Sequence, residues 1–233
     1  MTARIDQLFA GPARPLSRPG HPDVASGIAK LPLAGPVRLT ATGLDGDEQG
    51  DRAWHGGPEK ALHHYAAEHY PLWRTLYPDS PVPLAAGAFG ENVSTAGMTE
   101  ATVCIGDVYR IGGALVQVSQ GRQPCWRLNR RLGSGDAALA MQTAGCTGWY
   151  YRVLEEGLLA RHDPIVLVER PCPAWPLARL IAALFTADRD APALHGEWRA
   201  ASLLAPLAPN WRATFARRTE TGRIEDWARR LYE

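Results

Sequence analysis

The middle of the chain contains the stretch VYRIGGALVQVSQG, residues 108–121, which holds the clearest strand pattern of the sequence. Val116 and Val118 alternate there with Leu115 and Gln117. This two-residue period is that of a strand with one buried face. Two consecutive glycines stand just before the strand, and glycine pairs favour tight turns. The stretch therefore predicts a β-hairpin.

The same pattern extends outward on both sides of this hairpin. From residue 84 to residue 119, short apolar stretches are separated by glycines at spacings suited to hairpins. Further strands are predicted at 37–42, 60–65, 149–153 and 165–168, and short helices at 66–77 and 136–144. Many short strands joined by glycine turns are typical of a closed, barrel-like β domain. We therefore expect a mainly β fold over residues 1–170.

The character of the sequence changes after residue 173. Leucine and isoleucine then recur at helical spacing, at Leu177, Leu180, Ile181 and Leu184. Further helical patterns contain Trp198, Trp211, Phe215, Ile224, Trp227 and Leu231. We expect a small all-α domain of about three helices over residues 171–233.

Composition excludes several classes of protein. The 233 residues include 25 basic and 24 acidic ones, so no basic excess is present to bind a nucleic-acid polymer. The apolar run at 180–185 is too short to span a bilayer, and residues 1–14 lack the apolar core of a signal peptide. We expect a cytoplasmic protein with no nucleic-acid or membrane partner.

Four cysteines stand at positions 104, 125, 146 and 172, without a C-x-x-C pair. The surroundings of Cys125 differ from the others, because residues 108–135 contain five arginines and no acidic residue. Nearby cations favour the thiolate, which is the form that acts as a nucleophile or metal ligand, and the same arginines can bind phosphate. The alternative is a buried structural thiol among solvated arginines, and the residues alone leave both open. We interpret Cys104, Cys146 and Cys172 as structural.

Two loop segments offer weaker candidates. His55 precedes two glycines, which allow a ligand to approach the backbone closely, but the residues alone favour a loop histidine that makes one turn hydrogen bond. Glu91 and Asn92 follow Gly90 and could belong to a binding site, but the residues alone favour a tight turn with an Asx-type bond. No nucleophile elbow, P-loop or dinucleotide-binding fingerprint is present.

These segments together resemble a known family. In order along the chain they are SGIAK at 26–30, GLDGDEQ at 43–49, HGGPEKA at 55–61, FGEN at 89–92, GD at 106–107 and SQ-x-R-x-PC at 119–125. The series resembles the MOSC family, named for the C-terminal domain of molybdenum cofactor sulfurase, and within it the stand-alone YiiM-like branch. The match runs from about residue 20 to residue 170, and the helical tail is similar to the three-helix domain of that branch. Each motif alone is weak, but six in order are specific.

The resemblance implies a closed MOSC β-barrel with a few short helices that binds a molybdenum–pterin cofactor. It implies that the thiolate of Cys125 is the molybdenum ligand, and that the protein reduces N-hydroxylated bases of the hydroxylaminopurine type. The residues given cofactor-binding roles on this basis are Ser26, Lys30, Asn92, Arg122 and Cys125. The residues given catalytic roles are Cys125, His55 and Glu91, with either Glu91 or His55 as the proton donor. Asp47 and Asp107 are expected to hold turns.

The chain departs from the branch at three places in these motifs. Gly121 stands where the branch often has proline, which predicts a more mobile loop around Cys125. Gly27 stands where alanine would be unsurprising, and Trp126 is bulkier than the tyrosine or phenylalanine expected there. None of these changes removes the thiol.

Two other functions stay open at this point. Cys125 could carry a persulfide in a sulfur-transfer protein, or the chain could bind the pterin cofactor without turnover. A reductase would need a separate electron donor, a flavin or iron–sulfur protein, because the chain lacks the cysteine spacing of a ferredoxin. A homodimer is expected from the branch, and the helical tail is either a dimer element or a pocket lid.

Overall fold

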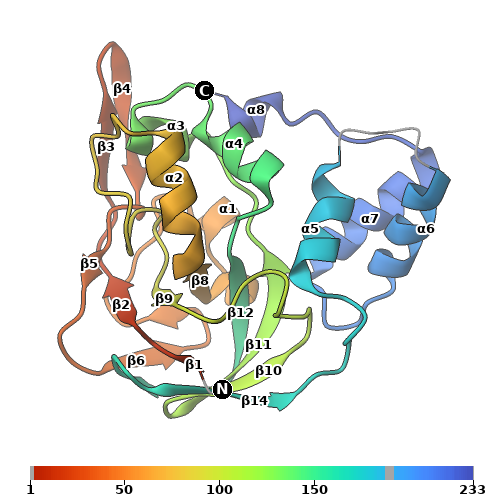
Figure 1. Ribbon diagram of the computed structural model, residues 1–233, viewed down its shortest axis with the longest axis horizontal. Helices are drawn as coiled ribbons and strands as arrows, with labels where there is room; N and C mark the ends of the chain where they lie inside the picture. The colour runs from red at the N-terminus through yellow and green to blue at the C-terminus, as the bar shows by residue number, and fades with distance from the viewer. Residues whose placement is uncertain (1–2, 187–191, 233) are drawn as a thin grey trace.

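A nine-stranded sheet forms the body of the protein up to residue 170 (Figure 1). The computed structural model describes residues 3–186 and 192–232. The strand order is β1-β14-β10-β11-β12-β8-β9-β2-β5, and neighbours are antiparallel except for β8 and β9. The strands are β1 (Ala3–Arg4), β2 (Gln7–Ala10), β5 (Leu31–Pro32), β8 (Leu62–Ala66), β9 (Val93–Thr95), β10 (Val108–Ile111), β11 (Ala114–Gly121), β12 (Trp149–Glu155) and β14 (Pro164–Glu169).

Two smaller sheets complete the β part. One contains β13 (Gly157–Leu159), β6 (Val37–Thr40) and β7 (Gly43–Leu44), and the other is the hairpin of β3 (Arg14–Arg18) and β4 (His21–Ser26). The hairpin predicted from residues 108–121 is confirmed as β10 and β11, which pair from Val108 opposite Gln117 to Ile111 opposite Ala114. The other predicted strands are confirmed as β6, β8, β12 and β14.

The closed barrel that we predicted is not found: in the described chain the sheet is open, with β1 and β5 at its edges. Only Ile5 and Asp6 separate β1 from β2 in the chain, although β1 is the first strand in the order of the sheet and β2 is the eighth. The sheet therefore curls until β1 and β2 lie near each other. The Ile5 amide donates to the carbonyl of Asp163, whereas the Asp6 amide donates to that of Ser94 on β9. Within two residues the backbone thus passes from the β1 side of the sheet to the β2 side. Two residues are too few to form a ladder of hydrogen bonds that would close the sheet into a barrel.

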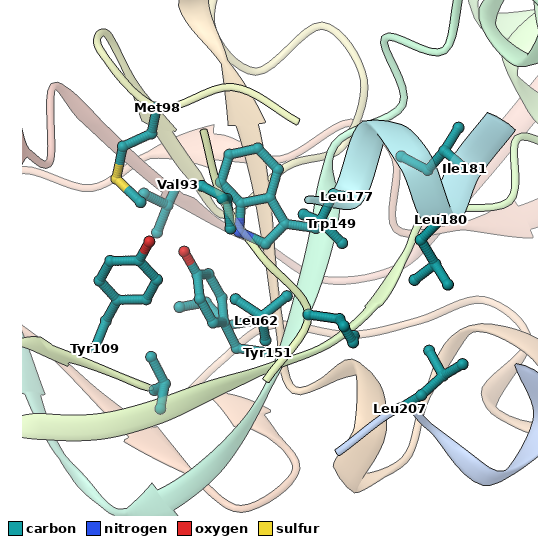
Figure 2. Close-up of a cluster of buried hydrophobic side chains, with 14 of the residues drawn as sticks. Leu62, Val93, Met98, Tyr109, Trp149, Tyr151, Leu177, Leu180, Ile181 and Leu207 are labelled. Carbon is teal, nitrogen blue, oxygen red and sulfur yellow. The ribbon is translucent and has the colours of Figure 1, made fainter. Parts of the chain in front are cut away.

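One hydrophobic core joins the sheet to the helical tail (Figure 2). Trp149 and Tyr151 of β12 are fully buried beside Leu62 of β8. The same cluster includes Leu177 and Ile181 of the tail, as Figure 2 shows. The β part and the tail therefore share buried apolar surface, which is the main source of their stability.

The predicted C-terminal helices are present. They are α5 (Leu177–Phe185), α6 (Pro192–Ser202), α7 (Pro209–Thr221) and the short α8 (Ala228–Leu231). The first three form a bundle, whereas α8 lies apart from them beside α4 and α3 (Figure 1). None of the helices in the described ranges is long and apolar enough to cross a bilayer.

A second core lies under the helices of the β part. It packs α2 (Tyr70–Leu76), α3 (Arg127–Leu132) and α4 (Ala137–Ala144) against Tyr65 and Phe89, and it includes Leu231 of α8. The predicted helix at 136–144 is confirmed as α4, whereas the one predicted at 66–77 begins as a 3-10 turn, η2 (Ala67–His69), before α2. Pro71 stands in the first turn of α2, where its missing N–H leaves no bond unmade.

A buried ion pair ties the start of α2 to the residue just before β12. Nε2 of His69 lies 2.7 Å from Oε2 of Glu100, whose other oxygen accepts a hydrogen bond from the amide of Gly148. Burial alone would lower the pKa of His69, but hydrogen bonds to Cys146 and Glu100 outweigh it and raise the pKa to about 10. At neutral pH the imidazole is therefore charged and stabilises the fold.

This pair predicts a pH dependence of stability. Because the pKa of His69 in the folded state, about 10, lies above the ordinary 6.5, its contribution is complete below pH 6.5 and is lost as the pH rises towards 10. We expect His69→Gln to lower the free energy of unfolding at pH 6, with a difference from wild type that shrinks by pH 10. Urea unfolding at several pH values measures this. His195→Gln, at an exposed histidine, is the control; an equal pH dependence in both variants would contradict the assignment.

Candidate functional site

A pocket opens beyond the end of β11, where several loops of the β part meet. It is lined by Ser26, Gly27, Ile28, Lys30, Asp47, Glu48, Gln49, Gly50, Asp51, His55, Lys60, His63, Phe89, Gly90, Asn92, Arg122, Cys125, Arg127 and Tyr150. The predicted site residues Ser26, Lys30, His55, Asn92, Arg122 and Cys125 are all among them. Glu91 is not. The structure thus gathers segments that are far apart in sequence around one thiol.

Cys125 lies between the end of β11 and the start of α3. Its carbonyl accepts a hydrogen bond from the amide of Leu128, which begins the helix. The thiol is half-buried, and its Sγ lies 4.0 Å from Nε2 of His55. The side chain is therefore accessible from the pocket and has one titratable neighbour in direct reach.

His55 is the last residue of the short helix α1 (Arg52–His55), whose first turn is capped by Asp51. Burial lowers the pKa of His55, and the charges of Arg127 and Lys60 lower it further, to about 4. The ring is therefore neutral at pH 7. Nη1 of Arg127 lies 3.4 Å from Nε2, and since arginine is only a donor, this nitrogen carries a lone pair.

Positive charge dominates the wall around the thiol. Lys60, Arg122 and Arg127 face the pocket together. Burial lowers the pKa of the Lys60 ammonium, and the nearby Cys125 offsets part of that effect. Nη1 of Arg122 is buried and has no hydrogen-bond partner within the described chain. A buried donor of this kind is satisfied by a ligand that carries an acceptor oxygen.

Lys30 differs from these cations because it is paired. Its Nζ donates to Oδ1 of Asp47, and both side chains are almost fully buried. Burial lowers the pKa of Lys30, and Asp47 opposes that shift. Asp47 also accepts hydrogen bonds from the backbone of Gly11 and, at 2.9 Å, from the amide of Asn92. Asp47 thus joins three strand ends at the pocket, beyond the turn-holding role that we expected.

Ser26 and Asn92 have their polar atoms engaged inside the protein. The Oγ of Ser26 accepts a hydrogen bond from the amide of Ile28 at 3.3 Å. Oδ1 of Asn92 accepts from the amide of His63, and its Nδ2 donates to Phe9 and Asp47. These side chains shape the pocket wall, and their predicted contacts with a cofactor stay predictions.

Glu91 lies behind the wall. Its carboxylate is fully buried and accepts hydrogen bonds from the amides of Gly87 and Phe89 and from the hydroxyl of Tyr70. The Tyr70 hydroxyl keeps its proton, because burial and the charge of Glu91 raise its pKa. This arrangement is that of a carboxylate that holds the 87–91 turn.

Backbone packing explains one of the departures from the family pattern. A Cβ at Gly27 would lie 2.0 Å from the carbonyl oxygen of Glu48, and one at Gly50 would lie 2.1 Å from that of Ala25. The two pocket-lining segments therefore touch backbone to backbone. Alanine at position 27 would force them apart in this chain.

Several pocket residues were missed from the sequence. Lys60, His63, Arg127 and Tyr150 all line the pocket. His63 and Tyr150 face each other across β8 and β12, with ring centroids 4.8 Å apart, and Nε2 of His63 is buried without a partner in the described residues. Two signals were available in the sequence: Lys60 is one of two lysines in a chain that otherwise uses arginine, and Arg127 is one of five arginines in the acid-free stretch 108–135.

The curled sheet and the helical tail agree with the comparisons with known proteins. The MOSC domain family model matches residues 51–166, and the chain belongs to this family. It is 40% identical over 208 residues to protein YiiM of Escherichia coli, which covers 89% of this chain and 90% of that protein. The crystal structure of YiiM from Escherichia coli matches all of both chains with a TM-score of 0.81 and 33% identity. A Gibberella moniliformis protein named "Reductase" is 42% identical over 154 residues, which is 66% of this chain and 27% of that protein.

The bonds of Glu91 predict a structural effect on substitution. Gln at this position keeps the shape but replaces one acceptor oxygen by an NH2 group, so a backbone amide loses its partner. We expect Glu91→Gln to lower the free energy of unfolding by about 1–3 kcal/mol in urea titrations. The control is Glu155→Gln, at an exposed carboxylate paired with Arg110. Equal stability of both variants would show that the carboxylate is not needed for the turn.

Proposed function

We propose that this protein is a molybdenum-cofactor-dependent reductase of N-hydroxylated compounds, such as hydroxylaminopurine-type bases. The observation that carries the proposal is the half-buried thiol of Cys125 in a pocket with Lys60, Arg122 and Arg127. Membership of the MOSC family supports the cofactor, and the relative named "Reductase" supports the redox reaction.

The residues present fit this cofactor. A thiolate is a soft ligand and suits molybdenum, and arginine and lysine suit the phosphate of the pterin. The unpartnered Nη1 of Arg122 offers a donor to such a phosphate. The described residues contain no group of three or more His, Cys, Asp or Glu side chains that could hold a metal ion. A cofactor that already carries its metal needs only one ligand from the protein, and Cys125 would provide it.

The chemistry of the site divides between cofactor and protein. When bound, the cofactor supplies two electrons, which with two protons convert an N–OH group into N–H and water. Cys125 would hold the metal, and Arg122 and Lys60 would hold the anionic part. His55 would present Nε2 as an acceptor beside the substrate, because the ring is neutral at pH 7. Because its pKa is so low, the His55 ring does not hold an extra proton at pH 7, and it would pass protons from solvent to the substrate.

The electron donor is proposed to be a separate flavin or iron–sulfur protein. The chain corresponds to 27% of the relative named "Reductase", so it shares only one segment with that protein. The four cysteines are free thiols, and none lies in a cluster that could hold iron and sulfur within the described chain.

Cys125→Ser tests the proposal. Wild-type protein from a host that makes the cofactor should contain about one molybdenum per chain and reduce 6-hydroxylaminopurine with a chemical electron donor. Cys125→Ser should lose the metal and the turnover, because a serine hydroxyl is not a soft anionic ligand. Cys146→Ser, at another half-buried thiol, should retain both. Elemental analysis and chromatography of the purine product measure the two quantities.

The same experiment separates the competing functions. Wild-type protein without molybdenum would overturn the proposal, and a sulfur atom added to Cys125 in mass spectra would then identify a sulfur carrier. Bound molybdenum without turnover of any N-hydroxylated compound would leave a cofactor-binding module. A sulfur carrier is the second candidate because the cations around Cys125 would also stabilise a persulfide anion.

Arg122→Ala tests the role of the unpartnered guanidinium. Loss of a charge-assisted hydrogen bond is worth about 1.5–3 kcal/mol, so cofactor retention after dialysis should fall by roughly ten- to a hundredfold. The melting temperature of the cofactor-free protein should change little, since Nη1 has no protein partner to lose. Arg110→Ala, at an exposed arginine of the same acid-free stretch, is the matched control. Equal molybdenum content in both variants would refute this role of Arg122.

A further inference from the structure

The residues on both sides of Cys125 are bonded to one distant residue, Arg230 of α8. Nη1 of Arg230 donates a hydrogen bond to the carbonyl of Pro124. The amide of Trp126 donates to the carbonyl of Arg230 at 2.8 Å. The peptide segment that carries the thiol is thus held at its preceding and its following residue by the C-terminal end of the chain.

Arg230 is itself firmly anchored. Its Nη2 donates to Oε1 of Gln142 on α4 at 2.5 Å. The next residue, Leu231, is buried in the second core, and its carbonyl accepts a hydrogen bond from Asn129 on α3 at 2.9 Å. The support for the thiol segment is therefore part of the packed interior.

The bundle of the tail holds the other end of the same loop. A Cβ on Gly121, the last residue of β11, would lie 3.0 Å from Ile181 of α5 and 3.1 Å from Trp211 of α7. The loop from residue 121 to residue 126 is thus packed against α5 and α7 at its start and bonded to α8 at its end. The glycine that predicts a mobile loop from sequence alone is covered by two helices.

We propose that Arg230 is a positioning residue for Cys125, and that the helical tail braces the thiol loop. The inference rests on the proposed function in one respect, because it takes Cys125 as the ligand whose position matters. A loop that is ordered in advance binds a ligand without a further loss of conformational entropy. Arg230 also remains charged at neutral pH, since burial lowers its pKa only to about 10 while the nearby Cys125 opposes that shift.

Hydrogen exchange of the cofactor-free protein tests the brace directly. In Arg230→Gln, exchange in the peptide covering residues 122–132 should accelerate about tenfold, because the charge-assisted hydrogen bond to the Pro124 carbonyl is lost, while exchange in β11 and β12 stays unchanged. Arg229→Gln is the matched control, as Arg229 is the exposed neighbour on the same helix. Arg230→Lys should restore part of the protection, because lysine can donate to Pro124 but not also to Gln142.

The outcomes separate the brace from general stability and from the proposed function. Unchanged exchange in Arg230→Gln, or faster exchange throughout the protein, would overturn the brace. Molybdenum content gives the second readout: it should fall severalfold in Arg230→Gln and not in Arg229→Gln. If Cys125→Ser kept its metal while local exchange rose in Arg230→Gln, the proposed function would fail and the brace would stand.

Discussion

Like charges held together around one thiol are the constraint on which this structure depends. Lys60, Arg122 and Arg127 share a pocket with Cys125, and they repel one another in surroundings that water screens poorly. The pKa of His55 is lowered to about 4, mainly by burial and further by these cations. Asp51, 3.9 Å from Arg127, offsets part of this repulsion, and an anionic occupant would offset more of it. The surrounding scaffold must therefore hold it together.

The scaffold holds one pocket cation, Lys30, in a buried ion pair and leaves the other cations beside the thiol. Lys30 is paired with Asp47, whose carboxylate also binds Asn92, so this corner of the pocket is rigid and nearly neutral. Close backbone packing at Gly27 and Gly50 fixes the segments beside it. Three cations, Lys60, Arg122 and Arg127, stand instead on the side of Cys125, where a metal-bound anion is proposed to bind. The pocket thus has a structural side and a reactive side.

Much of the fold and part of this site could be predicted from sequence, because they depend on local patterns. The hairpin of β10 and β11 follows from period-two alternation, and Cys125 follows from an acid-free stretch with five arginines. His63 and Tyr150 could not be found this way, since they meet only through the register of β8 and β12. The open edge of the sheet is likewise a matter of which strands pair, and alternation within a strand does not contain that information. Arg230 reaches Pro124 through tertiary folding alone.

Glycine at position 121, where the resemblance implies proline, has a physical role in the contact with the helical tail. Proline would restrict the loop through its own fixed φ, whereas glycine adds backbone entropy that the folded state must overcome. Glycine also lets Ile181 and Trp211 approach the end of β11 closely, at a distance where any Cβ would be crowded. The loop thus lacks the rigidity that proline would give its backbone, but it gains close contact with the helical tail. In this chain the order of the thiol loop is a property of the tail as much as of the loop.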